Sequence, residues 1–298
     1  MSGIQCHICS GSEIKLLMKK NGFDFFRCRN CRLEFIFPQP DNAALEKIYS
    51  ESYYDSWGLH LDAHAAQKSK RLTFEYRLDL VSKFLKPRDA ILDCGCATGF
   101  FLDLAAEKKF LPYGVEISDF AADVCRKKFE TGNIFQGNFE DAEFEGNKEN
   151  FFSAVFMTDY LEHVRSPRAV LETAFRFLKP GGMLVITTPD TSSLSHSIMN
   201  HSWIHYKTEH LFYFSKVNLE QLLTQTGFIE IRKRKGWKYF TLEYIHQQLI
   251  TYRHAVFTPV IQAMHKIAHD VLRKKTFRIH AGEMIVIAQK PLSEKPGK

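Results

Sequence analysis

Short apolar runs alternate along most of the chain with stretches in which an apolar residue returns every third or fourth position. The runs are typical of buried strands, and the stretches are typical of amphipathic helices. The first predicted strand begins at Ile91. The others cover 114–116, 134–136, 154–157, 183–187, 228–231 and 284–288. The predicted helices cover 68–86 and 216–226 and begin at Phe101, Asp119 and Pro167. This order predicts an α/β fold with a doubly wound, mostly parallel sheet.

Residues 232–282 interrupt this order before the last strand. Their apolar residues return at helical spacing, at 245, 249, 252 and 256 and again at 260, 264, 267 and 271, with Pro259 between the two sets. Over 232–275, ten Lys and Arg stand against two acids, a net charge of +8, so the remainder of the +6 chain is near −2. We therefore expect a basic helical insertion. Four interpretations stay open: contact with an anionic acceptor, peripheral contact with an anionic membrane or lipid-linked substrate, RNA binding, and a merely solvated helix face.

Two Cys-x-x-Cys pairs stand near the start of the chain: Cys6, Cys9, Cys28 and Cys31. Strand-like runs at 13–18 and 23–27 flank Asn21-Gly22, a hairpin signal. Four cysteines at this spacing favour a tetrahedral Zn²⁺ site. We expect residues 1–37 to form a small zinc ribbon whose metal is structural and supplies much of its folding free energy.

Residues 38–67 are expected to connect this ribbon to a catalytic domain at 68–298. The connection contains a predicted helix at 42–50 and an aromatic stretch at 53–57. That stretch either packs the ribbon against the domain or closes over an active site.

The stretch 91–99 carries the most informative chemistry, because an apolar run ends at Asp93 and enters a loop bounded by Gly95 and Gly99. Such a loop lets a nucleotide-like ligand approach bare backbone at a helix N-terminus. Asp93 would repel a diphosphate but would suit a cationic ligand such as the sulfonium of S-adenosylmethionine. Glu116 ends the next predicted strand, about twenty residues on, where an acid typically accepts hydrogen bonds from ribose hydroxyls.

With these motifs the chain resembles the class I S-adenosylmethionine-dependent methyltransferases over 68–231 and 283–290. The matching stretches are 92–99, 114–116, 136–140, 159–164 and 178–182. The resemblance implies a seven-stranded, mostly parallel sheet with the ligand at the carboxyl ends of its strands.

The resemblance also implies a set of cofactor-binding residues: Asp93, Gly95, Cys96, Gly99, Glu116, Ile117, Asn138, Phe139 and Thr158. In it the glycines border the methionine moiety, Glu116 holds the ribose, and Asn138 and Phe139 face the adenine. Two positions depart from the family pattern. Ala97 stands where a glycine is frequent, and Asn138 stands where Asp is frequent.

The predicted fourth strand is followed by Asp159, Glu162 and His163, which are our candidate catalytic residues. A helical turn would bring the three side chains to neighbouring faces, where His163 could act as a general base. The stretch also resembles quinone-type O-methyltransferases, in which an acid-x-x-Glu-His run binds a divalent metal ion. A purely structural role is the third alternative, and His205 or His210 is a candidate second base.

Composition adds limits on the class of protein. A hydrophobic fraction of 45% with 26 Phe indicates a globular protein with a substantial core, and no apolar run reaches the length of a membrane span. We expect a cytoplasmic protein with reduced thiols.

The function expected from these residues is S-adenosylmethionine-dependent methyl transfer to oxygen, or less favourably carbon, of a small molecule or sugar. The layout resembles bacterial methyltransferases of polysaccharide pathways, including the run 209–215 late in the chain. An RNA methyltransferase and a non-enzymatic cofactor-binding scaffold are the alternatives. The acceptor, the pathway and the oligomeric state do not follow from the sequence.

Overall fold

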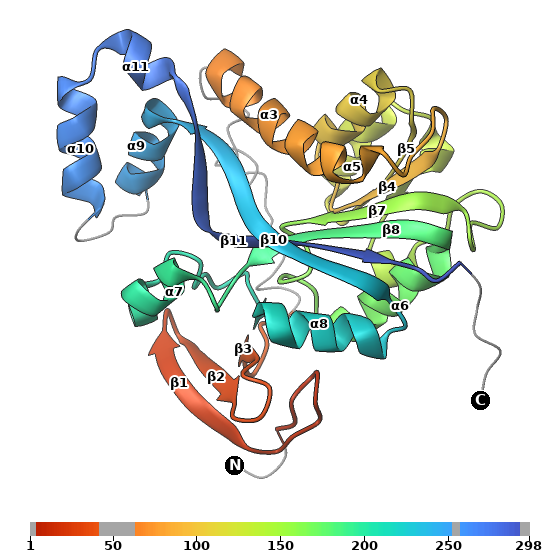
Figure 1. The fold of residues 1–298 in the computed structure, drawn as a ribbon, viewed down its shortest axis with the longest axis horizontal. Coiled ribbons are helices and arrows are strands. Elements are labelled where there is room, and N and C mark those ends of the chain that lie inside the picture. Colours follow the sequence, from red (N-terminus) through yellow and green to blue (C-terminus); the bar gives the residue numbers. More distant parts are fainter. Residues whose placement is uncertain (1–3, 42–62, 252–256, 293–298) are drawn as a thin grey trace. The chain divides into compact units, whose positions relative to one another are not determined.

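The computed structural model describes residues 4–41, 63–251 and 257–292 (Figure 1). The predicted helix at 42–50 and the aromatic stretch at 53–57 lie outside them. The chain forms two compact units. The first is built from Met1–Ile48, Val81–Gly236 and Gly282–Lys298, and the second from Tyr49–Leu80 and Trp237–Ala281. The second unit thus contains most of the helix predicted at 68–86 together with most of the insertion predicted at 232–282.

A seven-stranded sheet of order β10-β11-β8-β7-β4-β5-β6 forms the centre of the first unit. Its strands are β4 (Ala90–Cys94), β5 (Leu111–Glu116), β6 (Ile134–Gln136), β7 (Phe152–Thr158), β8 (Leu178–Pro189), β10 (Ile229–Thr241) and β11 (Thr276–Gln289). The run from β6 to β8 is parallel, and β11 pairs antiparallel with β8. The predicted α/β fold with a mostly parallel sheet is confirmed.

Helices cover both faces of this sheet, with α4 and α5 on one side and α6 and α8 on the other (Figure 1). The α-helices within the described residues are α3 (Ala63–Ser82), α4 (Phe100–Glu107), α5 (Asp119–Arg126), α6 (Pro167–Phe177), α7 (Leu194–Met199) and α8 (Lys216–Gln225), followed by α9 (Leu242–Thr251), α10 (Phe257–Ile267) and α11 (Asp270–Lys274). Serine hydroxyls cap several of them. Ser118 and Ser166 accept backbone N–H groups at the starts of α5 and α6, and Ser215 forms a capping box with Asn218.

The middle strands are buried along almost their whole length, because helices shield both faces of a parallel sheet. Aromatic rings fill the space beside them. Phe152, for example, lies 5.2 Å from Tyr113 and 6.0 Å from Phe177 between ring centroids. The abundance of phenylalanine in the sequence is therefore explained by the core.

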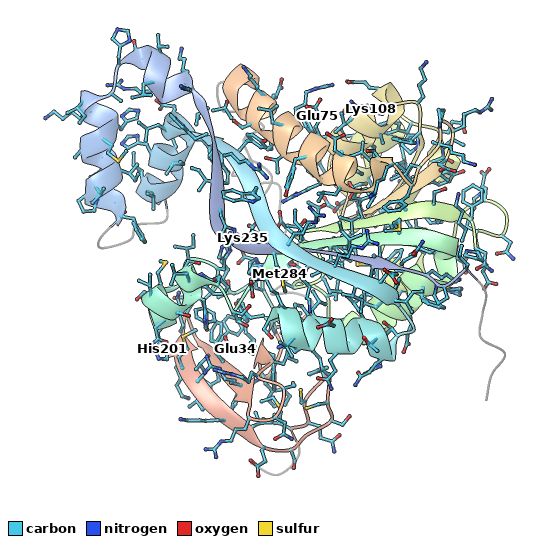
Figure 2. The ribbon with its side chains drawn as sticks, in the orientation of Figure 1. Glu34, Glu75, Lys108, His201, Lys235 and Met284 are labelled. Carbon is cyan, nitrogen blue, oxygen red and sulfur yellow. The ribbon has the colours of Figure 1, made fainter. Side chains whose placement is uncertain are left out.

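The insertion predicted at 232–282 is helical in its middle part, where the apolar spacing indicated helices. Residues up to Thr241 continue β10 and residues from Thr276 form β11, and the helices among the described residues between them are α9, α10 and α11. The basic run Arg232–Lys235 is exposed on β10, the last strand in the sheet order (Figure 2). Charged side chains on an edge strand oppose pairing with another chain, and a run of charges has no apolar periodicity that would reveal the strand.

A second, smaller sheet of order β1-β2-β3-β9 contains the cysteine-bearing region. Its strands are β1 (Ile14–Lys20), β2 (Phe23–Cys28), β3 (Glu34–Ile36) and β9 (Phe212–Tyr213). The hairpin predicted at Asn21-Gly22 is confirmed, with φ of 51° and 82° at its two turn residues. Strand β9 was not predicted. It pairs Glu34 with Tyr213 and Phe35 with Phe212, and so joins residues early and late in the chain.

Buried Glu34 is the polar centre of this junction, and Figure 2 labels it. Its carboxylate accepts hydrogen bonds from the Arg27 guanidinium at 2.6 and 2.8 Å and from the Tyr206 hydroxyl at 2.6 Å. Although burial alone would raise the pKa of Glu34, hydrogen bonds from His196 and Tyr206 and the charge of Arg27 hold that pKa below its usual value. The carboxylate is thus buried, ionised and fully engaged.

Replacing this carboxylate should destabilise the fold far more than replacing an exposed ion pair of the same sheet. Glu34→Ala leaves the half-buried Arg27 and the buried Tyr206 donors without their acceptor, so we expect a loss of about 3 kcal/mol in the free energy of unfolding. Lys19→Ala removes the exposed Lys19–Asp24 pair and should cost less than about 1 kcal/mol. Urea unfolding followed by circular dichroism measures both, and equal losses would contradict the assignment of Glu34 as the centre of the junction.

Candidate functional site

The loop after β4 has the left-handed backbone that its glycines predict. Gly95 and Gly99 have φ of 74° and 83°, and Ala97 between them has φ of 47°. The N–H groups of Gly95 and Cys96 donate to the Val115 carbonyl at 2.8 and 3.0 Å, which ties the loop to β5. Ala97, which stands where the family often has glycine, therefore adopts a backbone conformation that favours glycine. This costs roughly 1–2 kcal/mol.

Both glycines are also required by the space around them. A Cβ at Gly95 would lie 2.8 Å from the Tyr160 ring, and one at Gly99 would lie 2.9 Å from the Cys125 sulfur. Helix α4 starts immediately after Gly99. The loop is thus a tight stretch of backbone in front of a helix N-terminus, where a nucleotide-like ligand can approach closely.

Two buried carboxylates flank this loop, Asp93 near the end of β4 and Glu116 at the end of β5. Glu116 accepts the Ala97 N–H at 2.8 Å through Oε2 and the Ser118 N–H at 2.9 Å through Oε1. Because these N–H groups fix the carboxylate, its remaining lone pairs have defined directions. Fixed anionic oxygens suit a cation and hydroxyl donors, and they disfavour a diphosphate.

Ile117 follows Glu116 with 53% of its surface exposed, which leaves an apolar side chain beside the carboxyl edge of the sheet. Thr158 ends β7 at the same edge and is partly buried. Cys96, within the glycine loop, is buried, and its sulfur lies 3.8 Å from that of Cys125. Its side chain therefore points into the protein.

The two residues predicted to face an adenine are placed differently from each other. Phe139 is fully buried, its ring 5.8 Å from that of Phe177, so it exposes no surface to which a ligand could bind. Asn138 is exposed, and its side-chain amide donates to Asp141 at 3.1 Å. A ligand contact by the Asn138 amide would compete with that bond.

At the end of β7 the chain forms a turn in place of the expected helical turn. The His163 N–H donates to the Tyr160 carbonyl at 3.0 Å, and Asp159 has a positive φ of 52°. This turn brings Glu162 and His163 together with His210, the three having ligand atoms within 4.8 Å of one another. Asp159 is not in that group, although its charge raises the pKa of Glu162.

The pKa values of the group favour neutral side chains. Burial, followed by the charge of Asp159, raises the pKa of Glu162 to about 8. Burial lowers the pKa of His163 to about 4 and that of His210 well below its usual value. At neutral pH the site therefore holds a carboxylic acid and two uncharged imidazoles, whose ring centroids lie 4.6 Å apart.

Two polar atoms of this group, Glu162 Oε2 and His210 Nδ1, are buried and have no hydrogen-bond partner within the described parts of the chain. Such atoms are rare in folded proteins and commonly indicate a ligand, ion or water. One carboxylate and two imidazoles are a donor set that binds divalent transition metals. The arrangement can thus serve either proton transfer or metal binding.

The remaining histidines of the candidate second-base region are dispersed. His201 is exposed on a short 3₁₀ helix (Asn200–Ser202; Figure 2), and His205 is buried with its ring 4.8 Å from Trp203. Of these candidates, His210 alone joins the group at Glu162.

Sequence reasoning missed Thr188 and Glu283, two neighbours that act on the pKa of Glu162: Thr188 lowers it, and the like charge of Glu283 raises it. The two residues lie on adjacent strands, since Thr188 pairs with Met284 in the register of β8 and β11. An acid at the start of the last predicted strand was the one available signal for Glu283.

Backbone hydrogen bonds connect this site to the cysteine-bearing sheet. The N–H groups of Leu211 and Phe212 donate to the Glu162 carbonyl at 2.8 and 3.1 Å, and the Ile36 N–H donates to the Leu211 carbonyl at 3.0 Å. The residue next to His210 is therefore held between the turn that carries Glu162 and strand β3.

The four predicted metal ligands gather in that sheet. The sulfurs of Cys6 and Cys31 lie 3.3 Å apart, those of Cys9 and Cys28 lie 3.6 Å apart, and all four are within 4.8 Å of one another without a disulfide. A hydrogen bond from Cys31 lowers the pKa of Cys6 to about 5, which favours a thiolate there. Four sulfurs at these separations can surround a tetrahedral ion at ordinary metal–sulfur distances.

A family model with the description "Methyltransferase domain" matches residues 65–231, more than half of the chain. This chain belongs to that methyltransferase family. The sheet order and the carboxylate-flanked glycine loop described above agree with the match. No helix in the described ranges is long and apolar enough to cross a membrane.

Several known methyltransferases are similar to it. A ubiquinone biosynthesis O-methyltransferase of Xanthomonas axonopodis pv. citri is 29% identical over 43% of this chain and 54% of its own length. A 24-methylenesterol C-methyltransferase of Arabidopsis thaliana is 28% identical over 46% of this chain and 41% of its own. The match thus spans about half the length of these curated relatives.

Among solved structures, phosphoethanolamine N-methyltransferase 2 of Haemonchus contortus in complex with S-adenosyl-L-methionine has a TM-score of 0.53 at 17% identity. The similarity covers 87% of this chain and 62% of that one. At this identity the likeness shows a shared fold.

Proposed function

We propose that this protein is an S-adenosylmethionine-dependent methyltransferase that acts on a hydroxyl oxygen of a small molecule or sugar. The observation that carries the proposal is the fixed carboxylate of Glu116, which is hydrogen-bonded to the Ala97 N–H of the glycine loop and stands beside buried Asp93. The names of the ubiquinone O-methyltransferase relatives support oxygen as the acceptor atom, and that of the sterol relative keeps carbon as the alternative.

In this proposal the chain binds the cofactor through groups already in place. Glu116 accepts hydrogen bonds from the ribose hydroxyls, Asp93 lies near the methionine moiety, and exposed Ile117 covers the adenine. The backbone at Gly95 and Gly99 admits the ligand, because no side chain projects there. When bound, S-adenosylmethionine supplies an electrophilic methyl carbon on a sulfonium.

The acceptor hydroxyl must lose its proton as its oxygen forms the bond to the methyl carbon. His163 is uncharged at neutral pH and can take that proton at its unprotonated ring nitrogen. Protonated Glu162 offers a donor that orients the acceptor oxygen. His210, packed edge-on against His163, positions the imidazole.

A divalent metal ion at Glu162, His163 and His210 is a second candidate for activating the acceptor. The unsatisfied atoms Glu162 Oε2 and His210 Nδ1 favour it, because a metal would engage both. Such an ion would lower the pKa of an acceptor hydroxyl. Activity that is lost in EDTA and restored by added Mg²⁺, which thiolate ligands do not favour, would select this alternative over loss of zinc from the cysteine group.

The cysteine group is proposed to hold one structural Zn²⁺ ion. Four cysteine sulfurs without an open ligand position are the donor set of structural zinc sites. Zinc there would fix β3, whose neighbour β9 adjoins His210.

The rival proposal of an RNA methyltransferase depended on the basic run. In this run, Arg232 is ion-paired with Glu230 of the same strand and Lys233 with Glu220 of α8. Paired cations contribute less to binding of a nucleic acid backbone, so a small-molecule acceptor is better supported.

Glu116→Gln should weaken S-adenosylmethionine binding at least ~10-fold, because the neutral amide loses two anionic acceptors for the ribose hydroxyls. Isothermal titration calorimetry measures the effect. Asp123→Asn, at an exposed acid on α5, is the matched control and should bind normally. An unchanged affinity in Glu116→Gln would refute the ribose assignment.

His163→Ala should lower turnover ~100-fold or more, because it removes the proposed proton acceptor. Turnover is followed as S-adenosylhomocysteine released in the presence of an acceptor. His201→Ala, which changes an exposed histidine outside the group, should retain the wild-type rate. A near-normal rate in His163→Ala would return this residue to a structural role.

Cys28→Ser should lose the zinc that elemental analysis is expected to find at one ion per chain. It should also lower turnover while leaving S-adenosylmethionine affinity within a few-fold, because the cysteine sheet pairs with β9 beside His210, whereas the cofactor carboxylates stand on β4 and β5. A metal-free wild type would remove the zinc site. Equal loss of affinity and turnover would mean that the ribbon supports the whole fold.

A further inference from the structure

Helix α10 has polar contacts on the side that faces α9 and exposes several apolar side chains. Helix α10 packs against α9. Between the two, His265 Nε2 lies 2.7 Å from Glu243 Oε2, the Thr258 hydroxyl donates to the Leu249 carbonyl at 3.2 Å, and the rings of His265 and His246 stack at 3.9 Å. A helix pair that packs only on itself would instead place apolar side chains between its helices and polar side chains toward solvent.

The outward face of α10 is an apolar stripe. Within α10 the exposed apolar residues follow each other at intervals of three and four, the spacing of one helix face. The stripe, with its continuation in α11, consists of Phe257, Val260, Met264, Ile267, Val271 and Leu272, all exposed. Ile267 and Val271 have 84% and 74% of their surface exposed. A contiguous exposed apolar surface of this kind indicates an interaction site.

Cations accompany the stripe. Lys266, Arg273, Lys274 and Lys275 stand within 257–275 against the single acid Asp270, a net charge of +3. Arg273 pairs with Asp270 at 3.5 Å, while the three lysines are exposed. Their long side chains can reach past an inserted apolar face to negative groups at a surface.

We propose that α10 and α11 dock this protein on an anionic lipid bilayer, with the apolar stripe in the interface and the lysines at lipid phosphates. A short helix with an apolar face and flanking cations suits the plane of the interface, and α10 is too short to span a bilayer. Charge decides between a bilayer and a second copy of the chain, because two such faces would bring like charges together, whereas anionic lipid neutralises them.

Flotation of the full-length protein with unilamellar vesicles tests the proposal without reference to methyl transfer. The protein should float with phosphatidylcholine vesicles that contain phosphatidylglycerol, and less with vesicles of phosphatidylcholine alone. The double variant Ile267→Glu/Val271→Glu should lose at least ~10-fold in binding, and Lys274→Glu/Lys275→Glu should lose a similar factor that high salt reproduces in the wild type.

Leu292→Glu is the matched control, since Leu292 is an equally exposed apolar residue outside α10 and α11. It should float as the wild type does, and thermal melts should show all variants folded, because the changed side chains are exposed. The proposal is overturned if the wild type does not float with anionic vesicles, or if the Ile267→Glu/Val271→Glu variant floats unchanged. A wild type that is dimeric in sedimentation velocity, does not float, and becomes monomeric in that variant would assign the stripe to self-association.

Discussion

The main-chain hydrogen bonds of Leu211 and Phe212 are the constraint on which the proposed acceptor site depends. Their N–H groups both reach the Glu162 carbonyl, while the Leu211 carbonyl accepts from Ile36. A single stretch of backbone is thus held from one side by the turn after β7 and from the other by the cysteine-bearing sheet. His210 directly precedes this stretch, so its imidazole is placed by contacts that do not involve the imidazole itself. The ribbon is for this reason part of the site's framework.

The cofactor side depends on a different constraint, the burial of negative charge. A buried carboxylate is costly unless hydrogen-bond donors engage it, and Glu116 meets this condition with N–H groups from both the glycine loop and the start of α5. The same bonds make the loop rigid before any ligand arrives. The left-handed backbone at Ala97 belongs to this arrangement, since its N–H is one of the two donors. The strained backbone at Ala97 thus helps to hold the glycine loop in one conformation.

Features set by local periodicity and motif spacing could be predicted from the sequence. The strands around Asp93 and Glu116, the hairpin at Asn21-Gly22 and the cysteine group are of this kind, because each follows from neighbouring residues. Strand β9 could not be predicted, since two residues carry no periodicity and their partner strand lies far away along the chain. The approach of His210 to Glu162 depends on that pairing. The charged run Arg232–Lys235 in the middle of β10 was misread for a related reason, because edge position, and not apolar alternation, makes it a strand.

Strand β9 also has a consequence for how the chain acquires its structure on the ribosome. Glu34 pairs with Tyr213, a separation of 213 − 34 = 179 residues. During vectorial synthesis the two Cys-x-x-Cys pairs emerge first, but the edge of β3 and the carboxylate of Glu34 wait for most of the chain to be translated. Pairings of such long range form late and slowly. The nascent ribbon is therefore an incomplete sheet with an open edge until the segment after β8 leaves the exit tunnel and closes it.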